Sequence, residues 1–162
     1  MQPHAAIVER IEELTVHERK NLVAALHDLV NAAYNAAEGY HAAAIAVRTP
    51  ELQSFFEECA GNRRESGAKL GELLRELGEE AGAHPTLGGE LHRALIAFRG
   101  VIEAGEPAAI LAECERGEHN ALGHYERALA QKMPMAVASV LLDQVTHVRS
   151  ARSAYERMRH PW

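Results

Sequence analysis

Apolar residues recur every three or four positions along most of this chain, the spacing of one face of an α-helix. The first long run extends from about 16 to 48, and its apolar face is Leu22, Leu26, Leu29, Ala33, Ala36, Tyr40, Ala44 and Val47. No segment alternates β-branched and polar residues as a half-buried strand would. The pattern therefore predicts an all-α protein.

Helix boundaries are signalled by capping and breaking residues. Thr15 followed by Glu18 is a capping box, and Thr49-Pro50 ends the first long helix and begins the second. The second helix is expected to end near Leu77, with Gly78 at the C′ position. Further helices are predicted from about 87 to 102, from about 107 to 131, and from Met133-Pro134 to about 159.

The lengths of the connections predict the topology. The first and second long helices are joined by almost nothing, as are the third and fourth, so each pair forms an antiparallel hairpin. A connection of nearly thirty residues, containing a shorter helix, links the two hairpins. This is the arrangement of a ferritin-like four-helix bundle. We expect an N-terminal amphipathic segment over residues 1–15, with Ile7, Ile11 and Leu14 on one face, and the bundle over residues 16–162.

Composition narrows the class of protein. The 162 residues suit a single domain, and the net charge of −6 argues against a nucleic-acid surface. No apolar run is long enough to span a membrane, and charges at Glu9, Arg10 and Glu12 interrupt any signal sequence, so we expect a cytoplasmic protein. Cys59 and Cys114 have no zinc-site spacing and are expected to be buried, reduced thiols.

Several motifs resemble those of a known family. Glu113-Cys114-Glu115-Arg116-Gly117-Glu118, followed by Tyr125-Glu126-Arg127-Ala128-Leu129, is similar to the third-helix signature of a bacterial ferritin-like family catalogued as a domain of unknown function. Asp28-Leu29, Gly39-Tyr40, Asn62-Arg63, Leu91-His92-Arg93 and the run from Val148 to Arg159 extend the resemblance over roughly residues 20–160. The resemblance implies the fold and no activity.

Glu118 is the most informative polar residue, because it lies on an otherwise apolar helix face. A buried carboxylate is costly unless it is paired with a charge or bound to a metal. Counting along the helices places Arg63 at the same level, so we predict a buried Glu118–Arg63 ion pair. Tyr125, Gln144 and Arg152 are expected in the same polar layer, with Ser66 nearby and with Ala33, Ala36 and Ala37 of the first helix.

A metal at Glu118 and His147 is the alternative. A di-iron or di-manganese centre needs about four carboxylates and two histidines, with Glu-x-x-His on two of the helices. Here Arg63 and Ser66 occupy that spacing on the second helix, and Gln144 replaces the glutamate before His147 on the fourth. Arg152 also stands where the family pattern has a histidine. We therefore expect no cofactor, with iron or another divalent metal as the alternative.

The surface offers weaker signals. The ten histidines include three acid–histidine pairs at helical spacing, Glu38–His41, Glu115–His119 and Asp143–His147, which read as solvated side chains. A second apolar stripe on the first helix (Val23, Val30, Tyr34, Ala37 and Ile45) needs cover from the crossover helix or from a second subunit. We expect a homo-oligomer, of which a dimer is the simplest; the sequence does not identify a protein partner.

Three functions stay open. The first is a bundle of unknown role without a complete di-metal centre, acting through self-association or partner binding. The second is a divergent metal-binding ferritin-like protein or oxidoreductase, which would hold iron, manganese or zinc. The third is a small-molecule binding protein with a cavity lined by Ala33, Ala37, Ser66 and Ala121. No nucleophile–base pair or phosphate-binding loop supports an enzyme, and we predict no catalytic residue.

Overall fold

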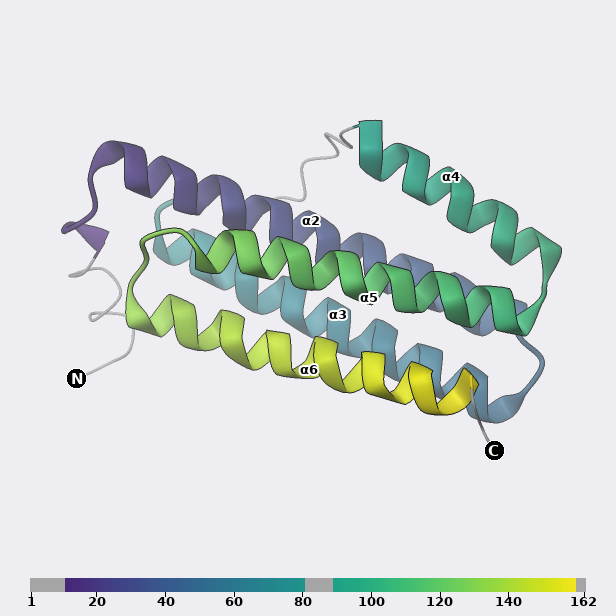
Figure 1. The fold of residues 1–162 in the computed structure, drawn as a ribbon. Helices are drawn as coiled ribbons and strands as arrows, with labels where there is room; N and C mark the ends of the chain where they lie inside the picture. The colour runs from purple at the N-terminus through teal and green to yellow at the C-terminus, as the bar shows by residue number, and fades with distance from the viewer. Residues whose placement is uncertain (1–10, 81–88, 160–162) are drawn as a thin grey trace.

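The computed structural model describes residues 11–80 and 89–159 (Figure 1). Within these ranges the chain is all-α and contains no strand. The helices are α2 (Val16–Ala46), α3 (Pro50–Glu76), α4 (Gly89–Ala104), α5 (Pro107–Leu129) and α6 (Met135–Arg159). The all-α prediction is therefore confirmed, and the helix ends agree with the expected ones to within a few residues.

The termini of the helices follow from their sequences. At the start of α2 the Thr15 hydroxyl accepts from the Glu18 amide and the Glu18 carboxylate accepts from the Thr15 amide, which confirms the capping box. Thr49 is the N-cap of α3, although its side chain makes no capping hydrogen bond. Gly78 ends α3 with a φ of 77°, a left-handed conformation that favours glycine.

The four long helices pack side by side, and α4 lies across α2 and α5 (Figure 1). Each long helix contacts two others: α2 packs on α3 and α5, and α6 packs on α5 and α3. The chain reverses direction between α2 and α3 and again between α5 and α6, so both hairpins are antiparallel. The crossover makes α3 and α5 run in the same direction, as the connection lengths predict.

The interior consists of two apolar clusters. One cluster lies where α2 begins and α3 ends, and joins leucines and valines of α2, α3 and α6 with Tyr125 and Ala128 of α5 (Leu22, Leu26, Leu29, Val30, Leu70, Leu74, Val137, Leu141 and Val148). The other is built from small and aromatic residues (Tyr40, Ala43, Ala44, Phe56, Cys59, Ala60, Ile110, Cys114 and Tyr155). Ile11, the first described residue, belongs to the first cluster. Residues 1–10 of the predicted N-terminal segment, including Ile7, lie outside the description.

The second apolar stripe of α2 has several partners within this one chain. Val30 and Ala37 are buried in the core, and the ring of Tyr34 lies against Gly67 of α3. Phe98 of α4 covers α2 near Gly39, so the crossover helix provides part of the cover. Ile45 stays 70% exposed. The side chains of residues 87–95, at the start of the helix predicted from about 87 to 102, lie outside the description.

None of the helices in the described ranges is both long enough and apolar enough to cross a membrane.

Candidate functional site

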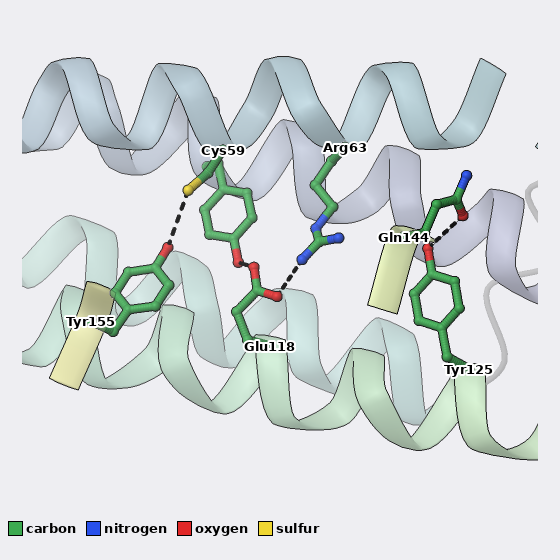
Figure 2. A network of polar contacts seen from close by, with 7 residues as sticks. Cys59, Arg63, Glu118, Tyr125, Gln144 and Tyr155 are labelled. Atoms are coloured by element: carbon green, nitrogen blue, oxygen red, sulfur yellow. Dashed lines mark hydrogen bonds and ion pairs between the residues drawn. The ribbon is translucent and has the colours of Figure 1, made fainter. Parts of the chain in front are cut away.

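Glu118 of α5 lies at the centre of a buried polar network (Figure 2). Its side chain is 1% exposed, and its two carboxylate oxygens have different partners. Oε2 accepts a hydrogen bond from Nη2 of Arg63 on α3, forming a buried ion pair, and Oε1 accepts from the Tyr40 hydroxyl on α2. Three helices thus meet at one carboxylate, and each of its oxygens is hydrogen-bonded.

Tyr40 is the member of this network that the sequence reasoning missed. Gly67 of α3 contacts Tyr34, and His41 of α2 bonds Glu57 of α3 at 2.7 Å, so Arg63 lies level with Ala37. Tyr40 lies one helical turn further along α2, and its long side chain reaches Glu118 of α5. An inward tyrosine within one turn of a predicted polar layer is the signal that could have revealed it.

Burial and charge act on this network in opposite directions. Burial disfavours the charged guanidinium, but the attraction of Glu118, reinforced by their hydrogen bond, outweighs it and holds the pKa of Arg63 above its ordinary value. Burial, followed by the charge of Glu118, raises the pKa of Tyr40 well above its ordinary value. Tyr40 therefore stays protonated and acts as a neutral hydrogen-bond donor.

A second buried network lies next to the first along the core (Figure 2). Gln144 of α6 accepts a hydrogen bond from the Tyr125 hydroxyl at 2.9 Å and donates to the Ser66 carbonyl oxygen at 3.2 Å. An amide can do both, whereas an ionised carboxylate at position 144 could only accept. Gln144 is therefore suited to joining α5, α6 and α3, and its donation to Ser66 would be lost in an ionised glutamate.

The thiols lie on the other side of Glu118. Cys59 and Cys114 are free and buried, and the Tyr155 hydroxyl lies 3.9 Å from Sγ of Cys59. Burial raises the pKa of Cys59 to about 11 and raises that of Cys114 as well. Because the thiolate is the reactive form, these thiols are unreactive near neutral pH.

Two residues predicted near this layer are located elsewhere. We expected Arg152 among the buried polar residues, and this prediction is wrong. Its side chain is 41% exposed and pairs with Glu156, one turn along α6, at 3.9 Å. Although its position falls on the inward stripe of α6, its long side chain extends to solvent. His147 is exposed on α6, whereas the carboxylate of Glu118 is enclosed by Tyr40 and Arg63.

The side chains of the layer do not fit a di-metal centre. Such a centre needs several carboxylates and histidines directed at one point. Glu118 faces a protonated arginine and a tyrosine hydroxyl, and arginine has no lone pair to offer a metal. Across residues 11–80 and 89–159, no three His, Cys, Asp or Glu side chains are grouped where they could hold an ion.

Two of the depressions on the described surface bear on the predicted small-molecule cavity. One, of about 380 Å³, lies between α2 and α5 and is lined mainly by Asn21, Asp28, His124, Arg127 and Gln131. The other, of about 370 Å³, lies on the outer side of α6. Neither includes Ala33, Ala37, Ser66 or Ala121.

Fold and site together define an all-α protein of long packed helices whose central polar layer is paired internally. The family model for a domain of unknown function (DUF2383) matches residues 21–131. The chain therefore belongs to this family, and the match contains Tyr40, Arg63 and Glu118. A comparison with curated proteins found no match.

Proposed function

We propose that this protein is a ferritin-like four-helix bundle whose core is held by an ion pair in place of a di-metal centre, and that it acts through association. The order of two antiparallel hairpins and one long crossover supports the ferritin-like assignment. The bacterial and cytoplasmic setting suggested by the sequence belongs to the same proposal.

The observation that carries the proposal is the complete engagement of Glu118. One oxygen accepts from Arg63 and the other from Tyr40, so the carboxylate is bonded without a metal. A metal at this position would have to displace a guanidinium that is itself buried, which would leave an unpaired positive charge next to a cation. Chemistry centred on this layer is therefore disfavoured, and the surface is where function is expected.

Several large apolar side chains are available on that surface. Ile45, Met135 and Leu142 are 70%, 68% and 53% exposed. Isolated exposed apolar residues are ordinary, but such side chains on two of the long helices give association something to bury. Sedimentation velocity on the purified chain over a wide range of concentration tests the proposal. A species larger than the monomer is expected, and a monomer at every concentration contradicts self-association.

A further inference from the structure

The depression between α2 and α5 is a groove along two antiparallel helices that lie side by side (Figure 1). Its volume of about 380 Å³ falls within the range of small-molecule sites. Three alanines give it an apolar lining (Ala24 and Ala25 of α2 and Ala128 of α5), and its other lining residues are polar or charged. We call this depression the α2–α5 groove.

The polar residues of the α2–α5 groove are ordered along its length. The charge of Asp28 on α2 acts on His124 of α5, so these two residues lie at the same end. Asn21 and Gln131 each lie seven residues from them, at the other end, because the two helices run antiparallel. At the rise of an α-helix the groove is roughly 10 Å long, and Arg127 lies between its ends.

Arg127 fixes the protonation state of His124. Nη2 of Arg127 lies 2.9 Å from Nδ1 of His124, and because a guanidinium can only donate, Nδ1 accepts. The ring is therefore neutral and carries its proton on Nε2. Partial burial, and after it the charge of Arg127, lower the pKa of His124, which agrees with the neutral form. On the α5 side the groove thus offers donors, namely the Nε2–H group and the remaining N–H groups of the guanidinium.

The α2 side offers the opposite charge. Asp28 forms no hydrogen bond or ion pair with any residue in the described part of the chain, and Arg127 forms no ion pair there. A carboxylate and a guanidinium thus line one groove from facing helices, within about one helical turn of each other, without pairing. Single exposed charges are ordinary, but two opposite charges beside one apolar lining match a ligand that carries both.

From this arrangement we propose that the α2–α5 groove binds a free α-amino acid. The guanidinium of Arg127 and the Nε2–H group of His124 hold its carboxylate, and the carboxylate of Asp28 holds its ammonium group. The two charged groups of an α-amino acid are attached to one carbon, which suits partners that face each other across a narrow groove. The side chain of the ligand then runs along the alanines toward Asn21 and Gln131.

This inference goes beyond the proposed function. The α2–α5 groove includes neither the residues of the network around Glu118 nor the exposed Ile45, Met135 and Leu142 that support association. The binding test therefore applies to the whole chain in either oligomeric state, and its result is independent of sedimentation.

Three small probes separate the two charges of the ligand. L-Alanine carries both, propionate keeps only the carboxylate, and ethylamine keeps only the ammonium group. Each is titrated into isotope-labelled protein at neutral pH, and NMR follows the ring signals of His124 and the backbone amides that line the groove. L-Alanine is expected to bind with a Kd on the order of 1 mM, which is attainable for so small a ligand. Propionate and ethylamine are expected to bind roughly tenfold more weakly, because each loses one charge-assisted contact.

Two substitutions remove one protein charge each. D28N should weaken the binding of L-alanine roughly tenfold and leave that of propionate unchanged, whereas R127Q should weaken both. The controls E126Q and R149Q replace an exposed acid of α5 and an exposed arginine of α6, both outside the groove, and should leave binding unchanged. Circular dichroism checks that each variant keeps its helices.

Three results would overturn the proposal. The first is a wild-type chain that does not bind L-alanine at concentrations far above the millimolar range. The second is propionate or ethylamine that binds as tightly as L-alanine, because the groove would then recognise a single charge. The third is a D28N variant that binds L-alanine as well as E126Q does, because Asp28 would then not hold the ammonium group.

Discussion

The hydroxyl of Tyr40 donates a hydrogen bond to Oε1 of Glu118, joining α2 to α5 across the core. Without it, one oxygen of a carboxylate that is 1% exposed would have no partner. Tyr40→Phe keeps the ring and removes the donor. We expect a loss of about 1–3 kcal/mol in the free energy of unfolding, measured by urea denaturation, because a buried charged acceptor is left unsatisfied. Tyr34→Phe, at an exposed tyrosine on the same helix, is the control and should change stability little.

Removing Glu118 should be costlier than removing Tyr40's hydroxyl. Glu118→Ala leaves the buried guanidinium of Arg63 unpaired, and we expect a loss of about 3–5 kcal/mol. The double variant E118L/R63M replaces both charges with apolar groups and should recover most of that loss. A double variant as unstable as Glu118→Ala would show that lost packing, rather than a stranded charge, accounts for the effect.

The glycines of α3 and α5 give a matched pair of packing predictions. A Cβ added at Gly67 would lie 3.0 Å from Cζ of Tyr34, whereas one at Gly117 would meet nothing within 4 Å. Gly117→Ala should therefore stabilise the protein by about 1 kcal/mol through helix propensity. Gly67→Ala should gain less or lose stability, since the Tyr34 ring must move. Equal gains at both positions would mean that Tyr34 does not pack against α3.

Stability is expected to fall at alkaline pH. Burial raises the pKa of Cys59 to about 11 from 9.0, and that of Tyr125 to about 12 from 10.0. Above pH 9 the unfolded chain loses protons that the native chain keeps, so the native state loses its advantage as pH rises. The urea midpoint should be flat from pH 7 to 8 and decline above 9. In C59A/C114A the decline between pH 9 and 10 should be shallower; an unchanged decline would mean that the thiols do not contribute.

The helices and their order could be predicted from the sequence because capping residues and apolar spacing act locally. Thr15, Pro50 and Gly78 have the same roles in the structure as in the prediction. Connection length was enough to predict the antiparallel hairpins. That Arg63 faces Glu118 could be predicted by counting residues along two parallel helices, since each residue adds a fixed rise.

The rest of the site depended on side-chain length and direction, which spacing does not determine. Tyr40 was counted only as a core residue, because Ala37 is the residue of α2 at the level of Arg63 and Tyr40 lies one turn further along. Arg152 was counted as inward from its spacing, but its long side chain extends to solvent and pairs with Glu156.

The metal content of the protein tests the central claim, that an ion pair holds the core at the level where di-metal four-helix bundles hold their metals. The purified chain would be incubated aerobically with ferrous iron, desalted, and assayed for bound metal. Our account predicts well under one equivalent per chain, and no change in Glu118→Gln, which alters the carboxylate and keeps its shape. Two metals per chain, lost in Glu118→Gln, would contradict it and would make the polar layer a metal centre.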